Sequence, residues 1–151
     1  MSYRVKYKGF EELEKKLERV ADKSVNICKG MVYSGADVCA DAIKSSLQAN
    51  VSGEATGELA NSLNIKPMSV QGTKVSTKIH FAGYNSHPSP KYASGQPNAI
   101  IAAVLESGRS DQPNRRATHF FSSAMNSSKG EAIQAMTEKL DKMIDAIISG
   151  E

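Results

Sequence analysis

Residues 99–109 read Ala-Ile-Ile-Ala-Ala-Val-Leu-Glu-Ser-Gly-Arg, and residues 119–125 read His-Phe-Phe-Ser-Ser-Ala-Met. An apolar run therefore ends in one acidic residue and a glycine, and a polar loop separates it from an aromatic pair. Short apolar runs bounded by turn residues are typical of buried strands, so we expect a strand over about 99–106, a tight turn and the start of a helix. No residue spacing in this stretch brings together metal ligands or the members of a catalytic centre. We interpret it as the scaffold of a protein–protein surface.

The bulk composition indicates one globular domain spanning residues 1–151. The chain is 40% hydrophobic and 23% charged, which excludes a disordered polymer. Its formal net charge of +3 is too weak to indicate a dedicated nucleic-acid binder, so nucleic acid is expected only as an incidental partner. No apolar run approaches the roughly 20 residues that span a bilayer, and the N-terminus lacks the apolar stretch of a signal peptide. We therefore expect a cytoplasmic protein with no membrane contact.

A helical period governs the N-terminal third of the chain. Apolar or small residues recur every three or four positions from Phe10 to Leu47, which predicts a long helix over about 10–49. Gly30 and Gly35 lie inside this pattern and indicate either a bend or the close approach of another backbone. A helix this long in a small domain is expected to project from the body or to pack against a neighbouring subunit.

The middle of the chain carries a strand period and then loses all regularity. Apolar and polar residues alternate on both sides of Gln71-Gly72-Thr73, which predicts a β-hairpin over about 62–82 with one apolar face. Pro67 must lie at an edge or an end of a strand because it has no N–H group to donate. Three prolines and two glycines in residues 83–98 then predict a flexible loop.

A helical period returns over about 118–149. Thr118 is a plausible N-cap, and Gly130 either bends this helical region or divides it into two helices. Taken together, the elements predict an α+β fold. In this fold a long N-terminal helix and a C-terminal helix pack on a small, mainly antiparallel sheet of three to four strands.

The chain contains residue types that are found in active sites and metal sites, but they do not occur at the spacing that such sites need. The three histidines lack the close spacing of metal ligands; they are His80, His87 and His119. No serine lies in a Gly-x-Ser-x-Gly turn. Gly53 and Gly57 are not followed by the Lys-Ser/Thr pair of a phosphate-binding loop. We therefore expect no catalytic residue, no metal and no cofactor.

The charged residues in and just after residues 99–109 indicate an interface. Glu106 is the only acidic residue of the predicted strand, so it is the best candidate for a perturbed pKa. Its simplest role is structural, either paired with Arg109 or bonded to backbone N–H groups. Arg109, Arg115 and Arg116 cluster in a loop that we expect to be exposed. Because arginine is enriched at protein interfaces, we favour contact with an acidic patch of a neighbouring subunit over contact with phosphates.

Aromatic side chains near these charged residues complete the candidate interface. Its members are Glu106, Arg109, Arg115, Arg116, Phe120, Phe121, Tyr84 and Tyr92.

Three segments, in order, resemble a known family. Thr56-Gly-Glu-Leu-Ala-Asn-Ser-Leu63 is similar to a Thr-Gly-x-Leu-x-x-Ser-Ile/Leu motif that follows a long helix and precedes a hairpin. Ala103-Val-Leu-Glu-Ser-Gly-Arg-Ser110 resembles an apolar-Glu-aromatic-Gly-Thr segment, with Ser107 in the aromatic position. Thr118-His-Phe-Phe-Ser-Ser-Ala124 is similar to a Pro-Phe-Leu-x-x-Ala helix start. This is the pattern of the phage tail-completion or head–tail joining (neck) proteins of long-tailed bacteriophages and prophages, and it covers roughly residues 10–148.

The resemblance implies a non-enzymatic structural protein of the virion. Such proteins form a ring, here expected to be a hexamer, between the head and the tail. The implied partners are further copies of the chain, a head connector or stopper protein, and the tail tube protein. The implied location is the host bacterial cytoplasm during assembly and the neck or tail of the virion afterwards.

Two rival interpretations come from other functional classes. The first is a small nucleic-acid-binding protein that uses the loop of Arg109, Arg115 and Arg116. The second is an enzyme centred on Glu106 and His80. A binder would lose affinity steeply with salt, and an enzyme would lose turnover when Glu106 is replaced by Gln.

Overall fold

The computed structural model describes residues 9–51, 55–112 and 114–150. The chain is α+β, as predicted. Its helices are α1 (Phe10–Asp22), α2 (Ser24–Asn50), α3 (Ala55–Asn61), α4 (Asn98–Ser107), α5 (Phe120–Ser127) and α6 (Lys129–Ser149). Its strands are β1 (Leu63–Ile65), β2 (Ser69–Gln71), β3 (Lys74–Ser76) and β4 (Ile79–Phe81).

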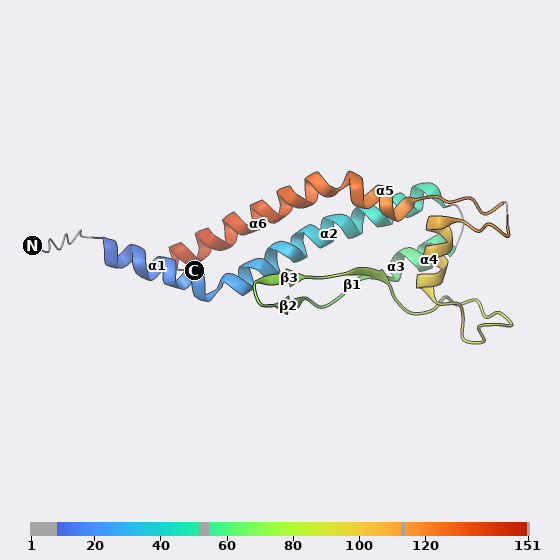
Figure 1. Ribbon diagram of the computed structural model, residues 1–151, viewed down its shortest axis with the longest axis horizontal. Helices are drawn as coiled ribbons and strands as arrows, with labels where there is room; N and C mark the ends of the chain where they lie inside the picture. Colours follow the sequence, from blue (N-terminus) through green and yellow to red (C-terminus); the bar gives the residue numbers. More distant parts are fainter. Residues whose placement is uncertain (1–8, 52–54, 113, 151) are drawn as a thin grey trace, which may run out of the picture.

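The molecule is elongated around two long helices, α2 and α6, which run antiparallel and make the most extensive contact in the fold (Figure 1). The hairpin lies along α2, while α3 and α4 gather at the end where α2 finishes. Helix α1 lies at the opposite end, beside the C-terminal part of α6. The length of the molecule therefore separates α1 from α4 and α5.

The predicted helix over 10–49 is confirmed, with one break. Lys23 alone separates α1 from α2, so the bend does not lie at either glycine. Gly30 and Gly35 instead face α6: a Cβ on Gly35 would lie 2.8 Å from the Met136 Sδ, and one on Gly30 would lie 2.6 Å from the Met143 Sδ. The glycines thus leave room for methionine side chains of α6, and the predicted approach of another backbone is seen at Gly35 alone, where the Ala132 carbonyl oxygen would lie 3.5 Å from the added Cβ.

The predicted hairpin over 62–82 is confirmed as two short antiparallel ladders. Strand β1 pairs with β4, with Leu63 opposite Phe81, and β2 pairs with β3 near the tip. Pro67 lies between β1 and β2, where the ladder is interrupted. This position suits a residue that cannot donate to a neighbouring strand.

The predicted strand over 99–106 is wrong, because these residues form helix α4. The buried residues of α4 are Asn98 and Ala102, four positions apart, which is the spacing of one helical face. A short apolar run has no period that distinguishes a strand from a buried helix. Within the described residues the structure has two two-stranded sheets, and residues 99–106 do not supply the third strand of the expected sheet.

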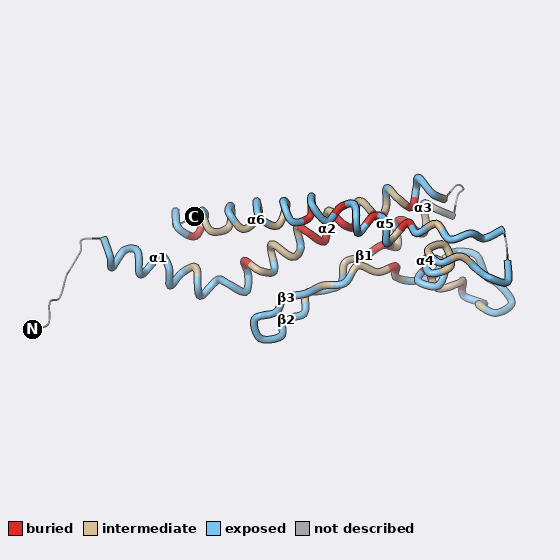
Figure 2. The backbone as a smooth tube through the Cα atoms, turned by 45° about the horizontal axis from the view of Figure 1, so that its top comes forward, coloured by how far each residue is buried: buried red, intermediate tan, exposed pale blue. Residues whose placement is uncertain are grey.

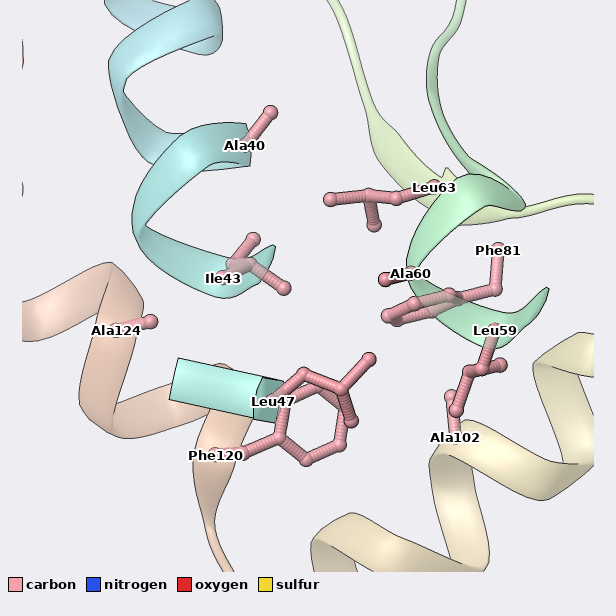
Figure 3. Close-up of a cluster of buried hydrophobic side chains, with 10 residues drawn as sticks. All are labelled: Ala40, Ile43, Leu47, Leu59, Ala60, Leu63, Phe81, Ala102, Phe120 and Ala124. Atoms are coloured by element: carbon pink, nitrogen blue, oxygen red, sulfur yellow. The ribbon is translucent and has the colours of Figure 1, made fainter. Parts of the chain in front are cut away.

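The core lies where α2, α3, α4, α5 and the base of the hairpin meet (Figure 3). Ten buried residues form it: Ala40, Ile43, Leu47, Leu59, Ala60, Leu63, Phe81, Ala102, Phe120 and Ala124. Phe120 is fully buried, and its ring packs edge-on against Phe81 with the ring centroids 6.0 Å apart. This cluster holds α4 and α5 in place and so positions the charged residues between them.

Candidate functional site: a capped helix and an arginine-lined pocket

Glu106 joins the end of α4 to the start of α5. Its Oε2 accepts a hydrogen bond from the Phe121 N–H at 2.8 Å, and its Oε1 accepts one from the Ser122 N–H at 3.1 Å. The first N–H groups of a helix have no partner inside the helix, and a negative charge beside them is favourable. Glu106 therefore caps a helix to which it does not belong. The predicted bonding to backbone N–H groups is confirmed, whereas pairing with Arg109 is not.

The cap replaces the one expected from Thr118. Helix α5 begins one residue later than that cap requires, with His119 in the N-cap position in a left-handed conformation (φ 50°). Thr118 instead donates from its backbone N–H and its hydroxyl group to the Leu105 carbonyl oxygen, at 2.9 and 2.7 Å. Because the His119 side chain makes no capping bond, the remote carboxylate of Glu106 takes that role.

The pKa of Glu106 is lowered from its ordinary value of 4.5. Partial burial acts in the opposite direction and raises the pKa, but hydrogen bonds from the Ser122 hydroxyl group and from the Phe121 and Ser122 amides outweigh it. The nearby charge of His119 adds to the lowering. A general acid or base at neutral pH needs a raised carboxyl pKa, so this environment favours a structural role for Glu106.

The loop after α4 is held closed by contacts between its own backbone atoms. Gly108 adopts a left-handed conformation (φ 71°), and a Cβ at this position would lie 2.7 Å from the Ala117 nitrogen. The Arg109 N–H donates to the Arg115 carbonyl oxygen at 3.0 Å. This turn brings the three predicted arginines to the same side of α4.

The three arginines differ in their pairing. The Arg109 guanidinium donates two hydrogen bonds to the Asp111 carboxylate, one of them from Nε at 2.8 Å. This bidentate pair raises the pKa of Arg109 and lowers the pKa of Asp111. Within the described residues, Arg115 and Arg116 form no ion pair. Their charges are therefore the ones available to a partner.

A pocket of about 500 Å³ lies between these arginines and α4. Its floor comes from the apolar side chains of α4, and its rim is polar or positively charged. The lining residues are Asn50, Val51, Gln96, Ile101, Val104, Leu105, Arg109, Gln112, Asn114, Arg115, Arg116 and Thr118. None of the described residues that line it carries a carboxylate, so the pocket suits a carboxylate or phosphate group supplied by a partner.

The structure does not bring all the predicted interface residues together. Phe120 is fully buried in the core and lies apart from the exposed members of the predicted set. Phe121 is half-buried beside it, with the two ring centroids 6.3 Å apart. Tyr84 is exposed on the irregular loop, and Tyr92 is half-buried on the same loop. Neither tyrosine lines the arginine pocket.

Sequence reasoning missed the polar wall of the pocket. Gln96 reaches it from the loop 83–98, and Asn50 reaches it from the end of α2. Single polar residues in loops and at helix ends have no periodic signal, so only the tertiary fold shows that they share a pocket. The loop itself is irregular as predicted, and a hydrogen bond from the Asn85 N–H to the Gln96 carbonyl oxygen at 2.9 Å ties its two arms together.

Comparison of the chain with protein-family models, curated proteins and solved structures found no match. In the part of the chain that the structure describes, no three His, Cys, Asp or Glu side chains lie close enough together to hold a metal ion. None of the helices in residues 9–51, 55–112 and 114–150 is both long and apolar enough to cross a bilayer.

Proposed function

We propose that this chain is a structural component of a phage or prophage virion, which assembles into a ring that completes the tail or joins it to the head and catalyses no reaction. The observation that carries the proposal is the placement of apolar side chains outside the core. They are exposed along the whole molecule, at Phe10, Leu13, Leu17, Val25, Tyr33, Val70, Tyr84, Ile100, Met125, Ile133 and Ile148. Single exposed apolar side chains are ordinary, but Phe10, Leu13 and Leu17 lie together on one face of α1, and a contiguous exposed apolar surface is typical of a protein–protein contact site.

The positions of the three family-like segments support the same proposal. The first segment contributes Leu59, Ala60 and Leu63 to the core, and the third contributes Phe120 and Ala124. The second segment supplies Glu106, which caps the helix that the third segment begins. Segments far apart in the sequence thus meet around one core (Figure 3). This convergence gives a physical reason for them to occur together and in order.

The arginine pocket supplies a docking point for a neighbouring protein. A closed ring needs heterologous contacts, in which one surface of each copy binds a different surface of the next. An acidic segment of another copy, of the head connector or stopper protein, or of the tail tube protein would pair with Arg115 and Arg116. In this proposal the apolar floor of α4 holds the neighbouring part of that segment.

Deletion of the gene from its phage or prophage genome tests the function. We expect filled heads and separate tails to accumulate, as seen by electron microscopy, and a plasmid copy to restore joined particles. A copy carrying Arg115→Glu and Arg116→Glu should fail to restore them, whereas the matched control Lys142→Glu, on the exposed face of α6, should succeed. Joined particles in normal numbers without the gene, or a gene that lies outside any phage or prophage genome, would contradict the proposal.

A second candidate function, nucleic-acid binding, is favoured by one observation: three arginines line the same pocket. Each neutralised phosphate adds about −0.9 to the slope of log K against log salt. Because Arg109 is paired with Asp111, the charges of Arg115 and Arg116 alone predict a slope of about −2 for duplex DNA. That slope, together with its loss in the Arg115→Glu, Arg116→Glu variant, would identify the chain as a binder. Absence of measurable DNA binding would rule the alternative out.

A further inference from the structure

Helix α1 carries an apolar stripe that the fold leaves in water. Phe10, Leu13 and Leu17 lie three and four residues apart, on one face of the helix, and 66%, 51% and 62% of their surfaces are exposed. No residue of α1 is buried among the described residues, and Figure 2 shows the helix extending past the body as an almost wholly exposed rod. An amphipathic helix normally gains its stability by packing its apolar face against another surface. We therefore expect another protein surface to pack against this stripe.

A groove elsewhere on the molecule has the complementary character. It has a volume of about 570 Å³ and lies between the hairpin and helices α2, α5 and α6. Most of its lining is apolar or small, and the hairpin adds a polar edge. The lining residues are Val32, Gly35, Ala36, Cys39, Ser76, Thr77, Lys78, Ile79, Phe121, Met125, Ala132 and Met136.

The charge of α1 is opposite in sign to that of the hairpin, which forms one wall of the groove. Helix α1 carries five acidic and three basic residues, namely Glu11, Glu12, Glu14, Glu18 and Asp22 against Lys15, Lys16 and Arg19. The hairpin segment 63–81 carries Lys66, Lys74 and Lys78 and no acidic residue. Two α1 helices brought together would repel each other, whereas α1 on the hairpin side of the groove gains attraction. The charge pattern therefore favours contact between unlike surfaces.

We propose that the groove binds helix α1 of a second copy of this chain, so that copies join head to tail. The proposal rests on the self-assembly in the proposed function and names the surfaces that carry it. In its own copy α1 lies beside the C-terminal part of α6, at the end of the molecule (Figure 1). When α1 of each copy fills the groove of the next, the contact is heterologous, which is the kind that closes into rings.

Two surface variants test the proposal by complementation. The stripe variant carries Leu13→Asp and Leu17→Asp, and the groove variant carries Lys78→Glu and Met125→Glu, all at exposed positions. Each variant alone should associate at least about 100-fold more weakly than the wild type, because its one altered surface breaks every contact in a ring. An equimolar mixture should form a complex with the mass of two chains and none larger, because one intact stripe meets one intact groove.

The readout is sedimentation equilibrium over a concentration series, with circular dichroism to confirm that each variant is folded. The matched control is Lys142→Glu, which places an acid on an exposed residue of α6 that does not line the groove, and it should assemble like the wild type. A wild type that assembles while the mixture stays monomeric would overturn this inference and leave the ring intact, because the copies then join through other surfaces. A wild type that is monomeric at every concentration would overturn it too, and would indicate that a different protein covers the stripe. The gene-deletion phenotype tests the virion role separately.

Discussion

At the scale of single residues, Glu106 does the work that a local N-cap residue usually performs. Its carboxylate comes from the last turn of α4 and accepts hydrogen bonds from two amides of α5. His119, in the N-cap position, makes no side-chain cap. The bond therefore links two helices that a turn and a polar loop separate in the chain, so it contributes to tertiary structure as well as to helix stability.

We predict that Glu106→Gln lowers the free energy of unfolding by about 1 kcal/mol at pH 7, the usual effect of losing a cap. The Glu106 pKa is lower in the folded chain than its ordinary value of 4.5. Its stabilising effect is therefore complete above about pH 4.5 and is lost as the pH falls through the folded pKa. Denaturant unfolding of both proteins between pH 7 and pH 3 should show the difference shrinking at low pH.

The matched control for this experiment is Glu18→Gln, a change at an exposed carboxylate of α1. It should leave stability within about 0.5 kcal/mol of the wild type. Equal stability of wild type and Glu106→Gln at pH 7 would show that the two hydrogen bonds contribute nothing.

At the scale of secondary-structure elements, the contact between α2 and α6 depends on glycine. Gly30 and Gly35 lower the helix propensity of α2, but they leave room for Met143 and Met136 of α6. Gly35 is buried, whereas Gly130 at the start of α6 has no neighbour within 4 Å of an added Cβ. A side chain added at Gly35 would therefore collide with α6, whereas a side chain added at Gly130 would meet no neighbour.

Replacing Gly35 by Leu should therefore destabilise the fold by about 1–3 kcal/mol, the cost of overpacking a buried contact. The matched change Gly130→Ala should stabilise it by up to about 1 kcal/mol, because alanine is the better helix former and meets no obstacle. Thermal unfolding of the two variants beside the wild type measures both effects. A Gly35→Leu variant as stable as the wild type would mean that the helices do not approach closely here.

At the scale of the whole molecule, the main buried cluster and the exposed apolar side chains of α1 lie at opposite ends of the long axis. The core holds Phe120, Ile43 and Leu47, the largest fully buried side chains, near the end where α2 finishes. Helix α1, at the other end, contributes no buried residue. The main buried cluster therefore lies at one end, while α1 at the other end leaves apolar side chains exposed.

This separation predicts unequal effects of two truncations. Phe120→Ala removes a fully buried ring and should cost about 3–5 kcal/mol, which is a large share of the stability of a typical domain. Leu17→Ala removes an apolar side chain that is 62% exposed, and it should change monomer stability by less than about 0.5 kcal/mol. Chemical denaturation at a concentration where the chain is monomeric gives both values. A comparable loss for Leu17→Ala would show that α1 belongs to the folded core.

The spacing of apolar residues along the sequence was enough to predict most of the helices and the hairpin of this protein. The helix from Phe10, the hairpin around Gly72 and the C-terminal helical region repeat at intervals of 3.6 or 2 residues over long enough stretches to be identified. The position of Glu106 as a lone acid at the end of an apolar run predicted two alternatives, pairing with Arg109 or bonding to backbone amides, and the structure decided for the amides. The helices and the hairpin depend on residues that are close together in the chain, whereas the Glu106 bonds join residues 15 and 16 positions apart.

Only the tertiary structure decided the features that depend on distant neighbours. Residues 99–106 became a helix because they pack on α5, the hairpin and α3, and a short apolar run shows no such preference by itself. Phe120 became a core residue because Phe81 and Leu47 meet it there, while Gln96 and Asn50 were brought to the arginine pocket from separate elements. Burial and pocket membership are properties of packing between segments, and no pattern along one segment encodes which others it will meet.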